Sequence, residues 1–288
     1  MDKKRLQPGK RARKPESGRR SAGFLWTKSI FLAVAGITAL ILAFGSAGDP
    51  AAKTAQEIGA RRLFFEVVND YPHDPHAFLQ GLLWHEGCLY ESTGLYGQST
   101  LRRVDLATGR ILQSIRLPSD LFGEGLALVG QHLIQLTWDS KLGFVYDRGS
   151  FALVRRFTYE TEGWGLTYDG KMLIMSDGSS VLTYLDPVTF SPVRKLAVTM
   201  NGRPVENLNE LEFIEGRIWA NAWQTDLILC IDPGTGHVNS YLNLRGILPE
   251  KMRTGSEDVL NGIAYDARQK RIFVSGKLWP RIFEIRVK

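Results

Sequence analysis

The chain has 288 residues, of which 44% are hydrophobic and 23% are charged, an ordinary composition for a globular protein. The net charge of +6 comes from the N-terminus, because residues 1–23 carry +7 and the remainder therefore carries −1. A nearly neutral domain lacks the basic stripe that phosphate binding requires, which excludes nucleic acid as a partner.

The first 63 residues predict a tail, a membrane segment and a linker. Residues 1–28 are basic, and residues 29–48 contain no charge over about the length that crosses a bilayer as a helix. The positive-inside rule places the tail in the cytoplasm and the following domain on the extracytoplasmic side, periplasmic or cell-surface. The alternative is a cleaved signal peptide with a small-residue site at 45–47. Residues 49–63 are expected to be a linker or short helix.

Residues 64–288 contain one motif five times. Its core is Gln80-Gly81-Leu82, Glu124-Gly125-Leu126, Trp164-Gly165-Leu166, Asn209-Glu210-Leu211 and Asn261-Gly262-Ile263, with middle residues 44, 40, 45 and 52 positions apart. Each core is followed by a turn and a second apolar run, then by a third run, and in four repeats by a fourth run. Short β-rich runs with a period near 40–45 predict four-stranded sheets arranged radially. The sequence therefore predicts an all-β protein, a five-bladed β-propeller.

The fifth repeat ends without a fourth strand. The missing strand is expected at the other end of the domain, in residues 64–68 (FFEVV), where it would pair with the last blade and close the ring. Closure would remove two open sheet edges. The alternative is an open sandwich in which residues 64–68 form an ordinary strand.

The two cysteines, Cys88 and Cys230, lie in the first and fourth repeats, which are not neighbours in a ring of five. We expect two unpaired strand residues. They provide neither a disulfide framework nor the spacing of metal ligands.

The repeat breaks at the positions that line the central channel. The first-strand position is occupied by Gln80, Glu124, Trp164, Asn209 and Asn261, and the position after the second run by Gly94, Trp138, Gly178, Trp223 and Lys277. Phe78 and Phe122 precede Gln80 and Glu124 by two residues, on the same strand face. These residues predict an aromatic-walled pocket with a few polar groups, which is typical of a small-ligand site.

Each of these residues also has a structural interpretation. A lone tryptophan often packs between blades, Glu124 would fit a salt bridge in the channel, and Lys277 would fit a solvated surface. Asn209 and Asn261 would fit hydrogen bonds to the inner strands, which is the interpretation that we favour for Asn261.

The domain closely resembles the plant-type glutaminyl-peptide cyclotransferases, also called glutamine cyclotransferases. The resemblance runs through FLQGLLW, ESTGLYGQS, FGEGLAL, EGWGLTYDGKMLIMSDGSS, LNELEF, IWANAWQTD, VLNGIAYD and GKLWPRIFEI. It implies an acyltransferase that converts the N-terminal glutamine of peptides or proteins to pyroglutamate with release of ammonia. It implies site residues at Gln80, Glu124, Asn209 and Lys277 and at Phe78, Phe122, Trp138, Trp164 and Trp223. No metal ligand and no cofactor are expected, and the zinc-dependent animal enzymes have an unrelated fold.

The predicted chemistry is intramolecular attack of the α-amine on the side-chain amide of the same residue. Glu124 would move the proton from the attacking nitrogen to the leaving nitrogen. Lys277, with Asn209 or Gln80, would stabilise the negative oxygen of the intermediate.

Two other functions stay open on the sequence. A lactonase-like, calcium-dependent propeller hydrolase also gathers Glu and Asn at the channel mouth, but Lys277 disfavours a dication there. A binding propeller without catalysis would use the tryptophan pocket to hold a peptide or sugar.

Overall fold

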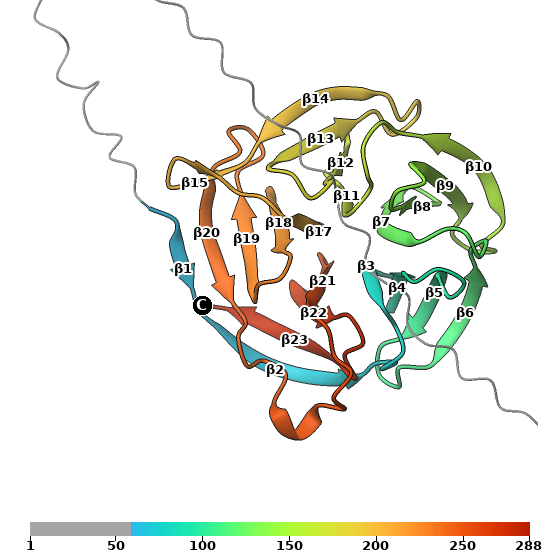
Figure 1. The fold of residues 1–288 in the computed structure, drawn as a ribbon. Helices are drawn as coiled ribbons and strands as arrows, with labels where there is room; N and C mark the ends of the chain where they lie inside the picture. Colours follow the sequence, from blue (N-terminus) through green and yellow to red (C-terminus); the bar gives the residue numbers. More distant parts are fainter. Residues whose placement is uncertain (1–58) are drawn as a thin grey trace, which may run out of the picture. The chain divides into compact units, whose positions relative to one another are not determined.

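The computed structural model describes residues 59–288, which form the all-β five-bladed propeller that the repeat predicts (Figure 1). In each blade, strands that are consecutive in the chain pair antiparallel in order from the centre outward, and two strands from the start of the described chain join the outer edges of blades 4 and 5. The first strands of the five blades contact one another around the centre. Equivalent positions of the repeat therefore meet there.

Blades 1 to 3 are continuous in sequence. Blade 1 comprises β3 (Leu79–His85), β4 (Cys88–Thr93), β5 (Thr100–Asp105) and β6 (Ile111–Arg116). Blade 2 comprises β7 (Gly123–Val129), β8 (His132–Thr137), β9 (Leu142–Asp147) and β10 (Leu153–Thr158). Blade 3 comprises β11 (Leu166–Tyr168), β12 (Leu173–Met175), β13 (Val181–Leu185) and β14 (Pro192–Ala197).

Blades 4 and 5 each include a strand from the start of the described chain. Blade 4 comprises β17 (Leu208–Ile214), β18 (Arg217–Ala222), β19 (Leu227–Ile231), β20 (Val238–Asn243) and β1 (Arg61–Leu63). Blade 5 comprises β21 (Leu260–Asp266), β22 (Arg271–Gly276), β23 (Arg281–Val287) and β2 (Phe65–Pro72). A small hairpin of β15 (Thr199–Met200) and β16 (Arg203–Pro204) and the 3-10 helix η2 (Glu250–Met252) complete the elements.

The outermost strand of blade 5 comes from before blade 1. Strand β2 pairs antiparallel with β23, from Phe65 opposite Val287 to Pro72 opposite Arg281. The same sheet thus contains residues from both ends of the described chain.

Strand β1 lies in the segment that the sequence assigned to the linker. It pairs in parallel with β20, so that Arg61 lies opposite Ser240. The outer edge of β20 has free N–H and C=O groups to which a further strand can bond. Because these are backbone groups and β1 has only three residues, no side-chain pattern in the sequence indicates this strand. The predicted membrane segment, 29–48, lies outside the described residues. Within residues 59–288, no helix has the length and apolar character needed to span a bilayer.

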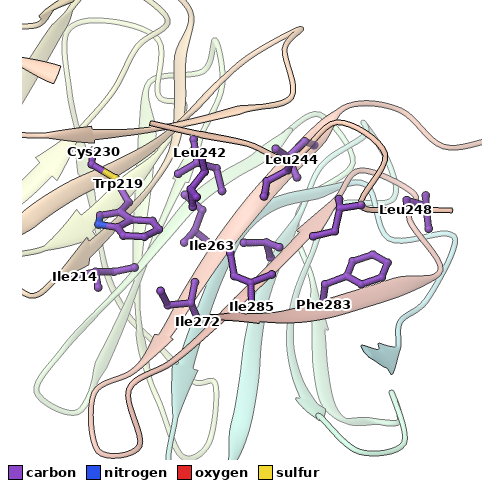
Figure 2. Close-up of a cluster of buried hydrophobic side chains, with 14 of the residues drawn as sticks. Ile214, Trp219, Cys230, Leu242, Leu244, Leu248, Ile263, Ile272, Phe283 and Ile285 are labelled. Carbon is purple, nitrogen blue, oxygen red and sulfur yellow. The ribbon is translucent and has the colours of Figure 1, made fainter. Parts of the chain in front are cut away.

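The hydrophobic core lies between neighbouring blades. Figure 2 shows one cluster in which Ile214, Trp219 and Leu242 of blade 4 face Ile263 and Phe283 of blade 5. Cys230 belongs to this cluster, and burial raises the pKa of its thiol to about 11. Cys88 and Cys230 are both free thiols.

The glycine at the middle position of the motif allows first strands to approach closely. A Cβ on Gly125 would lie 2.5 Å from the Leu166 nitrogen and 2.6 Å from the Gly165 carbonyl carbon. Both contacts are with backbone atoms of the next blade, which no rotamer change relieves. A side chain at this position would therefore force blades 2 and 3 apart.

We expect Gly125→Ala to destabilise the fold by about 2–3 kcal/mol, lowering Tm by roughly 5–10 °C. Thermal denaturation followed by circular dichroism measures this change. Gly149→Ala is the matched control, since its nearest atom would be the Asp147 Oδ1 at 3.5 Å, an ordinary contact in an exposed turn. Equal Tm values for the two variants would contradict the close-approach argument.

Candidate active site

One cavity of about 210 Å³ is lined by all nine of the residues that the sequence singled out as a site. The polar side chains are the most buried of them: Gln80 and Glu124 are each 4% exposed, Asn209 is 3% exposed and Lys277 is 5% exposed. The aromatic side chains are half-buried and complete the wall: Phe78, Phe122, Trp138, Trp164 and Trp223. The cavity thus places buried polar groups inside a ring of aromatic side chains.

Bulges in the first strands aim the polar side chains toward the cavity. In blade 1 the pairing with the second strand skips Gln80, and in blade 2 it skips Glu124 and Gly125. The same irregularity occurs in blades 4 and 5, at Asn209 and at Asn261. Bulges of this kind bend a strand and re-aim its side chains.

Trp164 is placed differently from its equivalents. It precedes β11 instead of lying within the first strand. The Ser176 hydroxyl accepts a hydrogen bond from the Gly165 N–H at 2.7 Å and donates to the Asn209 carbonyl, also at 2.7 Å. These bonds add to backbone hydrogen bonds from the Trp164 N–H to the Ser176 carbonyl at 3.0 Å and from the Ser176 N–H to the Gly165 carbonyl at 3.1 Å.

The alternation of glycine and bulky residues after the second strands has a steric cause. A Cβ on Gly94 would lie 2.2 Å from the Phe122 ring, and one on Gly178 would lie 2.7 Å from the Trp164 ring. The two glycines therefore provide the space that these rings occupy. The remaining equivalent positions carry Trp138, Trp223 and Lys277, which line the cavity themselves.

The Glu124 carboxylate lies in the most unusual electrostatic position. Its Oε1 accepts a hydrogen bond from the Gln80 Nε2 at 2.8 Å. Burial raises the pKa of Glu124 well above its ordinary value; the positive charge of Lys277 opposes this, the negative charge of Glu162 adds to it, and the Gln80 hydrogen bond opposes it. No ion pair reaches Glu124 within the described part of the chain, so the salt-bridged interpretation does not hold.

Lys277 is not a solvated surface lysine. Its Nζ lies 5.0 Å from the centroid of the Phe78 ring, a cation–π geometry. Burial lowers the pKa of Lys277, while the negative charges of Glu124 and Asp258 raise it. Hydrogen bonds from the Lys277 N–H to the Val259 carbonyl and from the Asp258 N–H to the Lys277 carbonyl, each 3.0 Å, fix its backbone.

The aromatic side chains contact one another edge to face. Ring centroids are 6.0 Å apart for Phe78 and Phe122, 5.8 Å for Phe122 and Trp138, and 5.5 Å for Trp164 and Trp223. Such contacts restrict the rings beyond simple burial. Trp164 of blade 3 and Trp223 of blade 4 therefore line the cavity while also contacting each other between blades.

The two asparagines have different surroundings. The Asn261 Nδ2 donates to the Leu79 carbonyl at 2.9 Å and lies 3.4 Å from the Gln80 Oε1, so it bonds inner-strand groups as expected. The Oδ1 atoms of both asparagines are buried without a hydrogen-bond partner among residues 59–288, but only Asn209 lines the cavity. A buried acceptor of this kind is costly to leave unpaired, which favours a donor on the bound molecule.

Sequence reasoning missed two carboxylates. The Oε2 of Glu162 accepts hydrogen bonds from the indole Nε1 of Trp138 at 2.7 Å and of Trp164 at 3.0 Å. Glu210 stands where the other four repeats have glycine, and it accepts bonds from the N–H groups of Leu82 at 3.2 Å and Ile263 at 2.8 Å. The departure from glycine was a readable signal for Glu210. Glu162 precedes Trp164 by two residues, as Phe78 and Phe122 precede Gln80 and Glu124, so a carboxylate in place of an aromatic residue was also a readable signal.

Metal binding would require several His, Cys, Asp or Glu side chains close together. Over residues 59–288, no three side chains of His, Cys, Asp or Glu come together in a way that would hold a metal ion.

Comparisons with known proteins agree with the resemblance of the motifs. The sequence matches the glutamine cyclotransferase family over residues 39–287. A glutaminyl-peptide cyclotransferase of Arabidopsis thaliana is 45% identical over 227 residues, covering 77% of this chain and 71% of the plant protein. The crystal structure of Myxococcus xanthus glutaminyl cyclase is 40% identical, with a TM-score of 0.74, covering 80% of this chain and 98% of that one.

Proposed function

Because this chain belongs to the glutamine cyclotransferase family, we propose that its cavity binds the N-terminal glutaminyl residue of peptides or proteins and cyclises it. The product is pyroglutamate and the leaving group is ammonia. The observation that carries the proposal is the buried Glu124 carboxylate, hydrogen-bonded to Gln80 and beside Lys277, within an aromatic cavity.

The reaction exchanges one bond to carbon for another. The α-amino nitrogen attacks the side-chain carbonyl carbon, and a tetrahedral intermediate forms whose oxygen is negative. The bond from that carbon to the amide nitrogen then breaks, and the nitrogen leaves as ammonia. Because nucleophile and electrophile belong to one residue, holding the side chain folded supplies much of the acceleration.

Glu124 is the proton carrier in this proposal. The attacking amine loses a proton and the departing nitrogen gains one, so one carboxyl group can serve both steps. Such a group works best when its pKa lies near the operating pH, and burial moves the pKa of Glu124 upward in that direction. The Gln80 hydrogen bond fixes the orientation of the carboxyl.

Lys277 and Asn209 stabilise charge and position the substrate. Among the described residues, Lys277 is the one basic side chain that lines the cavity, and its ammonium group suits the negative oxygen of the intermediate. The Asn209 amide, whose Oδ1 is buried without a partner in the described region, can accept an N–H of the substrate. The aromatic side chains around the cavity exclude water, which disfavours hydrolysis of the substrate's side-chain amide to glutamate.

The rate should depend on pH through Glu124. This group must be ionised to accept the proton, so a raised pKa means that kcat falls as the pH drops through that pKa, well above 4.5. The substrate amine, with a pKa of about 8, produces a second limb. Measuring pH–rate profiles for two substrates that differ in amine pKa distinguishes the two limbs, because only the limb of the substrate amine moves with the substrate. If no limb stays in place, the assignment of Glu124 is wrong.

The direct test of the function is ammonia release from dipeptides that begin with glutamine, with the pyroglutamyl product identified by mass spectrometry. Dipeptides that begin with asparagine are the matched control. A calcium-dependent hydrolase would lose its activity on chelation, and a binding propeller would bind the dipeptide without releasing ammonia.

We also infer that residues 64–288 are the catalytic domain and that residues 29–48 anchor it on the extracytoplasmic side of a membrane. The support is the uncharged stretch of 20 residues behind a tail of charge +7. The pairing of β2 with β23 supports closure of the ring by the N-terminal strand. Fractionation of cells that make the full chain tests the anchor, and the mass of the isolated protein distinguishes it from a cleaved signal.

A further inference from the structure

Glu162 joins two walls of the cavity that belong to different blades. Trp138 follows β8 of blade 2, and Trp164 precedes β11 of blade 3. The same carboxylate oxygen, Oε2 of Glu162, lies 2.7 Å from the Trp138 Nε1 and 3.0 Å from the Trp164 Nε1. One acceptor therefore fixes both indoles.

The indole geometry makes this acceptor important. The Nε1–H is the only donor on an indole ring, so its partner determines how the ring is turned about its bond to the chain. A bond to an ionised acceptor is shorter and stronger than one between neutral groups. Within residues 59–288, neither indole makes another hydrogen bond that would replace this one.

The backbone around Glu162 is itself held against blade 2. The Gly163 N–H donates to the Trp138 carbonyl at 3.1 Å, and the Thr161 hydroxyl donates to the Glu162 carbonyl at 3.0 Å. A Cβ on Gly163 would lie 2.5 Å from the Tyr159 hydroxyl, so the segment fits closely. The carboxylate thus projects from a fixed segment.

No Lys or Arg lies within ion-pairing distance of Glu162 in residues 59–288. Its charge is therefore directed at the two indoles and at the cavity behind them. A carboxylate whose role was an ion pair with a neighbouring blade would instead have a cationic partner.

Resting on the proposed function, we propose that Glu162 is a positioning residue of the cyclisation site, which holds Trp138 and Trp164 in the orientation that encloses the glutaminyl side chain. Glu162 does not line the cavity, so it acts through the two tryptophans. Its acceptor oxygen is the property that matters for this role.

Two substitutions separate this role from others. Glu162→Gln retains a carbonyl oxygen that can accept both indole hydrogen bonds, whereas Glu162→Ala removes the acceptor. We expect Glu162→Ala to raise KM for a Gln-initiated dipeptide about 10- to 30-fold, the effect of losing a well-fitted contact with the bound residue. We expect Glu162→Gln to keep KM within about threefold of the wild type, because neutral bonds are weaker but retain the geometry.

Thermal denaturation accompanies these assays, because a merely structural role would lower Tm and the active fraction while leaving KM unchanged. An unchanged KM in Glu162→Ala overturns the proposal. So does an increase in Glu162→Gln as large as that in Glu162→Ala, since charge and not the acceptor would then be responsible.

A second measurement does not need activity. The indole N–H resonances of ¹⁵N-tryptophan-labelled protein, assigned with Trp138→Phe and Trp164→Phe, report on the hydrogen bonds directly. Both resonances should move upfield in Glu162→Ala and much less in Glu162→Gln. If the wild type released no ammonia but these shifts occurred, the proposed function would be wrong while the two hydrogen bonds would be confirmed. Unchanged resonances in Glu162→Ala would instead refute the positioning role.

Discussion

Replacement of Glu124 with glutamine should lower kcat for ammonia release by about 10²- to 10⁴-fold, the contribution that a positioned acid–base group typically makes. The substitution keeps the size of the side chain and an oxygen that can accept the Gln80 hydrogen bond. It removes the ability to take and return a proton. KM should change little, because the substrate is held mainly by the other residues of the cavity.

Glu212→Gln is the matched control for this experiment. Glu212 is a second carboxyl of the inner strands, which accepts a hydrogen bond from the Tyr265 N–H at 3.1 Å and does not line the cavity. Burial raises its pKa to about 8, so it resembles Glu124 in environment but not in position. A folded Glu124→Gln variant with the activity of the wild type would exclude the proton-carrier role.

The second large effect is expected for Lys277→Met, which should lower kcat by about 10²- to 10³-fold, as for loss of an oxyanion-stabilising donor. Methionine retains an apolar stem beside the Phe78 ring but no charge. The positive charge of Lys277 lowers the pKa of Glu124, so its removal should also move the acid limb of the rate profile to higher pH.

Lys270→Met serves as the control, because Lys270 is an exposed lysine on a turn of blade 5. Its Nζ lies 3.2 Å from the Glu215 Oε1. It should leave both kcat and the acid limb unchanged. A Lys277→Met variant with normal kcat would show that the intermediate is stabilised by other groups.

The position of the nine cavity residues was predictable because residues at equivalent positions of the repeat lie close together in a propeller. Gln80, Glu124 and Asn209 occupy one repeat position, and all first strands meet at the centre. A departure from the repeat at such a position therefore indicates a site. The resemblance to the family then supplied roles for these residues, which the repeat alone does not.

Other features lie beyond the reach of the repeat. Glu162 occupies the repeat position of Phe78 and Phe122, but its role depends on two indoles whose directions the sequence does not specify. The bulges at Gln80 and Glu124 depend on hydrogen-bond register. Strand β1 depends on the free edge of β20, a tertiary property.

The pairing of β2 with β23 also determines the order in which the chain can fold during synthesis. Blades 1 to 3 are each complete once about 40 consecutive residues have left the ribosome, which favours early local folding. Strand β2 instead waits for residues 281–287, because its partners lie between 209 and 222 positions away. Until then it is an unpaired edge, open to association with other chains. A chain interrupted by a premature stop codon before Arg281 would lack the strand that pairs with β2 and would therefore keep that edge exposed.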